Sequence, residues 1–562
     1  MEERPPWRSR LSHRQDRARP FGVLCCAMST DSSTLLVVGA GPVGLTMANE
    51  LARHGVRCRI IDQTAARSQT SKALGIFPRT LEVFSAMGIA DRFLAAGDRL
   101  QGLAIHHGGE RLAAIDLTSV ASPFPFVLSL PQSETELLLI ERLASFGTEV
   151  ERELSLTTLE QTNESARATL RHADGREEVM ETPWLFGCDG AHSTTRHALG
   201  MEFEGAQYDE SFILADLRAE PAMDRNRLHL YLGNDGVFGF IPFGGDRWRI
   251  VANIPPESRG QNLPEVTLEE VQNLCDARGP GAIHLIDPVW LSRFHISHRK
   301  VQQYRKLRCF LLGDAAHIHS PAGGQGMNTG IQDAFNLAWK IALVVRGRAP
   351  AQLLGSYHTE REPIARGVLN LTDRITRMAT MRNSFAQGVR DFLLPVVSGI
   401  DLVGDKVADQ LSELAVSYRH SGLVENIGGG RLRAGDRAPD AELRDENGQA
   451  RRLFELFREP RHALLLFLGA GFDAVTKTEH LAGALTDLPE DVIDTYRIVR
   501  GEGAAAAELR DLSGLAHSTY GLFEGGVVLV RPDGYLGYRN DNFDPVSLRS
   551  YLARIFLSAP PR

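Results

Sequence analysis

The stretch TLLVVGAGPVGLTMANELARHGVRCRIIDQ, from Thr34 to Gln63, decides how the first half of the chain folds. It opens with the apolar run Leu35 to Val38, which is typical of a buried strand. Glycines in the spacing GxGxxG follow, then residues with helical spacing up to Gly55, and then a second strand that ends on Asp62. This order predicts a strand–helix–strand unit that opens a Rossmann-type α/β sheet.

The glycine-rich turn of this unit has the chemistry of a dinucleotide site. Gly39 allows a tight turn, Gly41 lets the backbone approach a pyrophosphate, and Gly44 lets helix and strand pack closely. The helix N-terminus offers free N–H groups to the phosphates, and the carboxylate at the end of the second strand can accept hydrogen bonds from ribose hydroxyls. This stretch alone leaves FAD and NAD(P) both open. The predicted contacts are Gly39, Gly41, Pro42, Val43, Gly44 and Asp62.

A second stretch, LLGDAAHIHSPAGGQGMNTGIQDAFNLAWK from Leu311 to Lys340, separates these two cofactors. A buried strand ends at Gly313 and Asp314, a glycine-rich loop follows, and a helix then begins with Asn328 and Thr329 as expected caps. A carboxylate after a strand can hold a polyol chain, and amides at a helix N-terminus stabilise the negative charge of reduced flavin. Because NAD has no ribityl chain, this stretch favours FAD.

Together with GCDGAHSTTR at residues 187–196, these two motifs resemble those of the single-component FAD-dependent aromatic hydroxylases, the class A flavoprotein monooxygenases. The likeness is to the phenol hydroxylase-like branch, which includes aromatic polyketide hydroxylases, and it covers roughly residues 34–375. It implies FAD as cofactor, NAD(P)H as transient co-substrate and O2 as oxidant. The implied reaction hydroxylates a small aromatic, phenolic compound through C4a-hydroperoxyflavin.

The resemblance also implies roles for single residues. Asp314 would bind the ribityl chain, Pro321 would lie near the reacting ring as a catalytic residue, and Asp189 would lie near the pyrophosphate. Lys72 takes the place usually held by an arginine on the FAD phosphates, which keeps the charge but loses the bidentate fork. The remaining cofactor contacts that the family implies are Gln132, Gly324, Gly326, Met327 and Asn328.

The sequence pattern of residues 202–300 is typical of an antiparallel sheet, and these residues are the predicted substrate domain. RLHLYLGNDGVFGFIPFGGDRWRIVANI reads as three strands joined by glycine-containing turns. Alternation places Phe238, Phe240 and Pro242 on one face. We name Tyr231, Phe240 and Pro242 as substrate contacts, with Tyr231 also a catalytic candidate, and plain sheet core is the competing interpretation of each. A general base for the phenol stays open.

The predicted domain organisation combines these parts with a C-terminal thioredoxin-like domain. HALLLFLGA and TYRIVR read as strands, GGVVLVRPDGYLGYR as a hairpin, and DPVSLRSYLARIFL as a closing helix. No cysteine occurs there, so dithiol exchange is excluded. The expected segments are a disordered extension (1–29), the first part of the FAD-binding domain (30–201), the substrate domain (202–300), the second FAD-binding part with helices (301–427) and the thioredoxin-like domain (428–562).

Composition excludes several classes of protein. The net charge of −8 argues against a nucleic-acid partner, and no apolar stretch is long enough to span a bilayer. The six cysteines form no CxxC pair, and His317 with His319 has no third ligand nearby, so we expect no metal and a reduced, cytoplasmic setting. We expect residues 1–27 to be a disordered tail or a misassigned start rather than a targeting peptide.

Two rival functions stay open at this point. A flavin dehydrogenase or oxidase could use the same fold, because fold does not fix function. A non-catalytic flavin-binding protein would also keep the cofactor motifs. The sequence leaves open whether the protein is a homodimer.

Overall fold

The structure is a computed structural model that describes residues 33–70, 73–107, 110–233, 236–254, 265–319, 324–380, 408–469, 481, 485, 488–501 and 509–558. The extension predicted at residues 1–29 lies outside the described residues. The contacts divide the chain into two compact units, and their boundary falls inside helix α7 (Gly326–Val345). One unit comprises residues 35–338 and 357–416, and the other comprises residues 1–34, 339–356 and 417–562.

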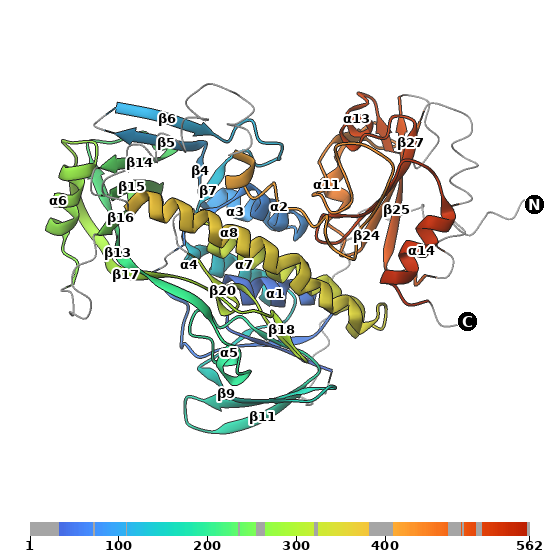
Figure 1. The fold of residues 1–562 in the computed structure, drawn as a ribbon, viewed down its shortest axis with the longest axis horizontal. Helices are drawn as coiled ribbons and strands as arrows, with labels where there is room; N and C mark the ends of the chain where they lie inside the picture. The colour runs from blue at the N-terminus through green and yellow to red at the C-terminus, as the bar shows by residue number, and fades with distance from the viewer. Residues whose placement is uncertain are drawn as a thin grey trace, which may run out of the picture. The chain divides into compact units, whose positions relative to one another are not determined.

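A six-stranded sheet forms the FAD-binding part of the first unit (Figure 1). Its order is β18-β19-β12-β1-β2-β8, and all neighbouring pairs are parallel except β18 with β19. This parallel order confirms the Rossmann-type prediction. The strands are β1 (Leu35–Val38), β2 (Cys58–Asp62), β8 (Val150–Arg152), β12 (Leu185–Gly187), β18 (Arg305–Lys306) and β19 (Cys309–Leu311).

Helices and two small sheets complete this part of the unit. Asn49 on α1 donates a hydrogen bond to the carbonyl of Leu139 on α4 at 3.0 Å, which ties these two helices together. The helices are α1 (Pro42–Arg53), α2 (Pro78–Ala86), α3 (Ala90–Ala96), α4 (Gln132–Ala144), α5 (Thr194–Ala198), α7 and α8 (Ser356–Thr380). The small sheets are β3 (Gly75–Ile76) with β7 (Val127–Ser129) and β4 (Asp98–Leu100), and β9 (Leu154–Gln161) with β10 (Ala166–His172) and β11 (Glu177–Thr182).

An eight-stranded sheet in the order β20-β17-β13-β16-β15-β14-β5-β6 contains most of the region predicted as the substrate domain. The strand pairs β14–β15 and β15–β16 are antiparallel, which confirms the predicted three-strand meander. The sheet extends beyond residues 202–300, because β14 pairs in parallel with β5 from residues 102–107. The elements are β5 (Gly102–His107), β6 (Glu110–Asp116), β13 (Glu204–Glu220), β14 (Arg227–Gly233), β15 (Gly236–Phe243), β16 (Arg247–Ile254), β17 (His284–Lys300), β20 (His317–Ile318) and helix α6 (Leu268–Arg278).

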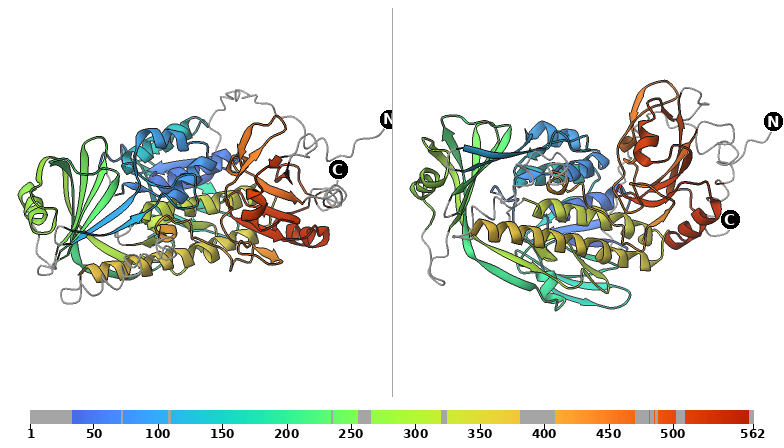
Figure 2. Two further views of the ribbon diagram at one scale, coloured as in Figure 1. Left: turned by 90° about the horizontal axis from the view of Figure 1, so that it is seen from above. Right: turned by 45° about the horizontal axis from the view of Figure 1, so that its top comes forward.

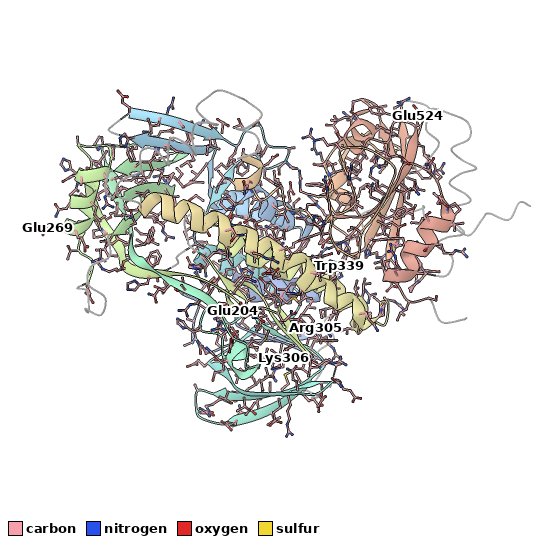
Figure 3. All side chains as sticks on the ribbon, viewed as in Figure 1. Glu204, Glu269, Arg305, Lys306, Trp339 and Glu524 are labelled. Atoms are coloured by element: carbon pink, nitrogen blue, oxygen red, sulfur yellow. The ribbon has the colours of Figure 1, made fainter. Side chains whose placement is uncertain are left out.

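Helix α6 covers the outer face of this sheet, and the FAD-binding part lies on the opposite side (Figures 1 and 2). The labelled side chain of Glu269 marks α6 at the outer edge of the unit (Figure 3). Residues of α6 and of the strands share one hydrophobic core, which contains Phe238, Phe240, Trp248 and Cys275. We call the face opposite α6 the inner face.

The C-terminal sheet has the mixed pairing that a thioredoxin-like fold requires. Strand β24 pairs in parallel with β25 and antiparallel with β27, which forms a hairpin with β28. These elements match the strands, hairpin and closing helix predicted from the sequence. They are β21 (Glu425–Ile427), β22 (Glu442–Arg444), β23 (Ala450–Arg452), α11 (Leu453–Leu456), β24 (His462–Leu468), β25 (Ile493–Arg500), β26 (Leu509–Asp511), α13 (Leu515–Tyr520), β27 (Gly525–Val530), β28 (Leu536–Asn540) and α14 (Pro545–Ile555).

The second half of α7 packs into the core of this C-terminal unit. Trp339, at 1% exposure, donates an indole hydrogen bond to Asp533 at 3.2 Å, and Asp533 also binds the buried Arg531. Among the described residues, none of the helices has the length and apolar character needed to cross a membrane.

Candidate active site

The glycine-rich turn after β1 is built by close backbone contacts. Gly39 has a φ of +101°, and a Cβ placed on it would lie 2.4 Å from the carbonyl oxygen of Cys188. A Cβ on Gly44 would lie 1.9 Å from the carbonyl oxygen of Gly39, so neither position accepts a side chain. In contrast, no described atom lies within 4 Å of a Cβ built on Gly41. This free space at the start of α1 fits a pyrophosphate approaching the backbone.

Asp62 at the end of β2 fixes the shape of that turn. Its Oδ2 accepts the backbone N–H of Ala40 at 2.7 Å, and its Oδ1 accepts the backbone N–H of Thr64 at 2.9 Å. The guanidinium of Arg152 lies 3.5 Å from Oδ1. Each carboxylate oxygen has more than one lone pair, so these contacts are compatible with the predicted ribose hydrogen bond. That role of Asp62 stays a prediction.

Gln132 is the first residue of α4. Its backbone N–H donates to the carbonyl of Ala73 at 3.1 Å, and its side chain donates to Glu136 at 2.8 Å. The predicted cofactor contact of Gln132 is not tested by these bonds. Lys72 and Pro321 lie outside the described residues, so their predicted roles are not tested either.

Asp189 has a structural task that the sequence did not reveal. Its carboxylate accepts hydrogen bonds from the hydroxyl of Ser193 at 2.5 Å and from the backbone N–H of Thr195 at 2.9 Å. These bonds hold the start of α5. The buried Arg196 then donates to the carbonyls of Ala191 at 3.0 Å and Ala315 at 3.2 Å, which ties the middle motif to the turn after β19. A position near the pyrophosphate remains a prediction for Asp189.

The turn after β19 is held by a buried carboxylate on α7. Asp333 accepts the backbone N–H of Gly313 at 3.1 Å, the ring nitrogen Nε2 of His317 at 2.7 Å and the guanidinium of Arg361 at 2.7 Å. Asp333, His317 and Arg361 are all 0% exposed. Burial favours the neutral acid, but Arg361 and His317 outweigh it and lower the pKa of Asp333. Asp314, next to Gly313, is exposed, so its carboxylate can reach a ligand.

The pair His317 and His319 belongs to this buried network. The two imidazole rings stack with centroids 5.4 Å apart, and His317 is engaged by Asp333. Burial, together with the neighbouring His317, lowers the pKa of His319 to about 3. Through these contacts the HIH motif is part of the packing around the turn.

Three cofactor elements converge on Val43. A Cβ on Gly313 would lie 2.8 Å from Val43 Cγ2, and a Cβ on Gly330 would lie 2.6 Å from the same atom. The start of α1, the turn after β19 and the first turns of α7 are thus in van der Waals contact. Glycine is required at both positions because any side chain would push these elements apart.

The glycine-rich loop at which the flavin is predicted to bind, which we call the flavin loop, is described from residue 324 up to the start of α7. Gly324 has a φ of +65°, and α7 begins at Gly326, so Asn328 and Thr329 lie inside the helix rather than capping it. Asn328 instead bonds the backbone of Gly75 and Phe77. Gln325, at 2% exposure, leaves its Oε1 without a hydrogen-bond partner among the described residues. A buried acceptor of this kind fits a ligand that donates a hydrogen bond.

These features fit FAD. The open space at Gly41 suits the pyrophosphate, and the exposed carboxylate of Asp314 suits a ribityl chain. The Oε1 of Gln325, which has no hydrogen-bond partner among the described residues, lies at the flavin loop. The helix N-termini of α1 and α7 supply partial positive charge to phosphate and to reduced flavin.

The predicted substrate contacts lie on the outer side of the sheet. Phe240 is 0% exposed and Tyr231 is 6% exposed, and both belong to the core that includes α6. Burial raises the pKa of Tyr231 to about 12, which disfavours it as a phenolate or base. Pro242 is also buried, and its carbonyl accepts the hydroxyl of Ser129 at 2.6 Å. The competing interpretation, sheet core, therefore describes Tyr231 and Phe240.

The inner face of the sheet carries a glycine that lies between aliphatic side chains. Gly239 stands between Leu230 and Val251 in the strand register, and a Cβ on it would meet nothing nearer than 3.6 Å. Because Gly239 has no side chain, the row of Leu230, Gly239 and Val251 is flat at its centre, and the aliphatic side chains around it are only partly buried. The partly buried aliphatic residues of this face are Leu103, Leu230, Val237, Ile241 and Val251.

Comparison with known proteins agrees with this site. The chain matches the family described as FAD binding domain over residues 32–372, and the family described as aromatic-ring hydroxylase, C-terminal, over residues 432–559. It is 34% identical to 6-methylpretetramide 4-monooxygenase of Streptomyces rimosus, covering 94% of each chain. It is 33% identical to pentachlorophenol 4-monooxygenase of Sphingobium chlorophenolicum, covering 90% of this chain and 94% of that protein.

A solved structure shows the same fold over nearly the whole length. The anhydrotetracycline hydroxylase of Streptomyces rimosus superposes with a TM-score of 0.75 at 30% identity, covering 94% of this chain and 99% of that chain. The resemblance stated from the three sequence motifs is confirmed. The chain belongs to the FAD-dependent aromatic-ring monooxygenases, and FAD is its cofactor.

Proposed function

We propose that this monooxygenase uses NAD(P)H and O2 to hydroxylate a phenolic ring of a fused polycyclic compound bound against the inner face. The observation that carries the proposal is the aliphatic row around Gly239 on the face of the sheet opposite α6, the side on which the FAD-binding part lies (Figure 1).

The size of the inner face supports a fused ring system. Leu230, Ile241 and Val251 come from three adjacent strands, so the aliphatic surface is about 10 Å wide at a strand spacing of roughly 4.8 Å. A single benzene ring would leave much of it uncovered. The relatives named for 6-methylpretetramide and anhydrotetracycline agree with a polycyclic substrate, whereas the one named for pentachlorophenol favours a small phenol as the second candidate.

Bound FAD would supply hydride acceptance from NAD(P)H and delivery of one oxygen atom of O2 to the ring, with the second atom leaving as water. The protein's own part is to hold and orient. Gly41 and Asp62 would hold the pyrophosphate and ribose, Asp314 would hold the ribityl chain, and residues 324–328 would lie along the pyrimidine edge of the flavin. The aliphatic inner face would exclude water from the reacting ring.

Several finer features belong to the same proposal. The resemblance supports Pro321 near the reacting ring and Lys72 on the phosphates. A phenol base is not assigned, since the buried Tyr231 is engaged in the core. A cytoplasmic location and a homodimer stay predictions.

Product analysis under 18O2 tests the proposal against its rivals. The purified holoprotein is supplied with NADPH or NADH and a panel that runs from simple phenols to fused tetracyclic phenols. We expect one labelled oxygen atom in the product of a tetracyclic substrate. An oxidised product without label would indicate an oxidase or dehydrogenase, and flavin that NAD(P)H never reduces would indicate a non-catalytic protein.

A further inference from the structure

Glu413 lies buried against the helix that begins at the flavin loop. It is 5% exposed, Gln332 donates a hydrogen bond from Nε2 to its Oε2, and the hydroxyl of Thr329 lies 3.5 Å from its Oε1. Thr329 and Gln332 stand in the first two turns of α7. The carboxyl group therefore fastens its own segment, residues 408–416, to the end of α7 that carries the flavin loop.

The same segment also holds the other side of the loop. The side chain of Gln325 donates to the carbonyl of Gln410 at 3.5 Å, and the backbone N–H of Arg79 at the start of α2 donates to the carbonyl of Ser412 at 3.3 Å. Apolar residues anchor the segment from behind. This cluster contains Ile115, Leu117, Val120, Ala408 and Leu414. Residues 408–416 thus bridge the N-termini of α2 and α7.

The charges around Glu413 leave it as a neutral acid near neutral pH. Arg361 on α8 favours the ionised form, but this guanidinium already binds Asp333 at 2.7 Å. Asp333 on α7 repels a second negative charge, while Gln332 and Thr329 on the same helix favour ionisation through hydrogen bonds. Burial is the largest effect and raises the pKa of Glu413 to about 8.

We propose that Glu413 is a positioning residue of the flavin site: its carboxyl group locks the first turns of α7 without placing a negative charge there, and its ionisation weakens the binding of reduced flavin. The N-terminus of α7 supplies partial positive charge, which favours the negative charge that accompanies flavin reduction. An ionised carboxyl at this place would oppose that charge. The inference rests on FAD binding and not on hydroxylation, so it can fail while the proposed function holds.

The test is the flavin midpoint potential of the holoprotein as a function of pH, measured beside FAD affinity. In the wild type we expect reduced flavin to be held about three- to tenfold more weakly, relative to oxidised flavin, once Glu413 ionises between about pH 7 and about pH 9.5. Glu413→Gln should show no such weakening of reduced-flavin binding at alkaline pH, and its flavin midpoint potential should equal that of the wild type at about pH 6. Glu160→Gln, which removes an exposed carboxyl on β9, should behave as the wild type.

A second variant separates titration of Glu413 from a merely structural role. The hydrogen bond from Gln332 favours the ionised form of Glu413. Gln332→Leu should therefore raise the pH at which the binding of reduced flavin weakens, without abolishing this weakening. The proposal is overturned if the binding of reduced flavin does not weaken at alkaline pH in the wild type, or if it still weakens in Glu413→Gln. It is also overturned if Gln332→Leu leaves the pH of this weakening unchanged. Should Glu413→Gln fail to bind FAD, the pH dependence of the flavin midpoint potential in Gln332→Leu alone tests the proposal.

Discussion

Asn328 joins the backbone around Phe77 to the flavin loop across a separation of 251 residues in sequence. Its Oδ1 accepts the backbone N–H of Phe77 at 3.0 Å, and its Nδ2 donates to the carbonyls of Gly75 at 2.9 Å and Gly324 at 3.2 Å. Because Asn328 is 0% exposed, water does not compete for these bonds. The start of α7 is thereby fixed to the strand that precedes α2.

Asn328→Ala should loosen the flavin loop. Hydrogen bonds of this kind contribute about 1 kcal/mol each, so loss of two or three should weaken FAD binding on the order of tenfold or more. Fluorescence titration of the apoprotein with FAD measures this. Asn163→Ala, at an exposed position between β9 and β10, is the control and should bind as the wild type. Equal affinities of the two variants would contradict the role given to Asn328.

Asp314→Ala should remove most of the bound FAD. The exposed carboxylate follows the anchored Gly313, and the resemblance predicts that it accepts hydrogen bonds from the ribityl hydroxyls. The flavin-to-protein absorbance ratio after purification measures occupancy. Asp276→Ala on the exposed side of α6 is the matched control and should purify with full occupancy. An Asp314→Ala protein that purifies with full flavin occupancy would refute the predicted role of Asp314 in FAD binding.

The two faces of β15 should respond differently to truncation. Ile241 lies on the inner face and is partly buried, whereas Phe240 lies in the core with α6. Ile241→Ala should weaken binding of an aromatic ligand while lowering the free energy of unfolding by only about 1 kcal/mol. Phe240→Ala should lower it by about 3–5 kcal/mol and leave the ligand affinity of the folded fraction unchanged.

Ligand titrations and denaturant unfolding of the same two variants check this pair. The reverse outcome, with ligand affinity lost in Phe240→Ala and retained in Ile241→Ala, would return the substrate site to the face first predicted from the sequence.

Asp333→Asn should destabilise the first unit at neutral pH. Removing one partner of a buried ion pair costs about 3–5 kcal/mol, because the charge of Arg361 is left uncompensated. The pKa of Asp333 is below its ordinary value, so its contribution is present above the ordinary carboxyl range and is lost as the pH falls through the lower folded pKa. The thermal midpoints of wild type and variant should therefore stay apart from about pH 7 down to about pH 5 and converge as the pH falls below about 4. A difference in thermal midpoint that is constant across this pH range would contradict the role given to Asp333.

Local patterns in the sequence predicted the parts of the fold that depend on neighbouring residues. The glycine spacing around Gly39 and Gly44 reflects two backbone contacts that admit no side chain, and alternation correctly placed Phe238 and Phe240 on one face. The strands and hairpin of the C-terminal sheet followed from the same periodicity.

What the sequence did not reveal depends on partners far along the chain. Alternation defines two faces of a strand, but only the position of α6 decides which of them is core. The parallel pairing of β14 with β5 has no local signature. Asn328 looked like a helix cap because its partners, Gly75 and Phe77, lie about 250 residues away. Asp333 could have been noticed as a carboxylate within an otherwise apolar helix.

Stopped-flow reduction of the bound flavin tests the central claim most directly. NADPH and NADH are mixed with the holoprotein alone and with each member of a panel from simple phenols to fused tetracyclic phenols, and oxygen is then added. We predict that a fused polycyclic phenol speeds flavin reduction many-fold and is recovered with one oxygen atom from O2. Reduction that no aromatic ligand accelerates, with reoxidation that leaves every ligand unchanged, would contradict the account.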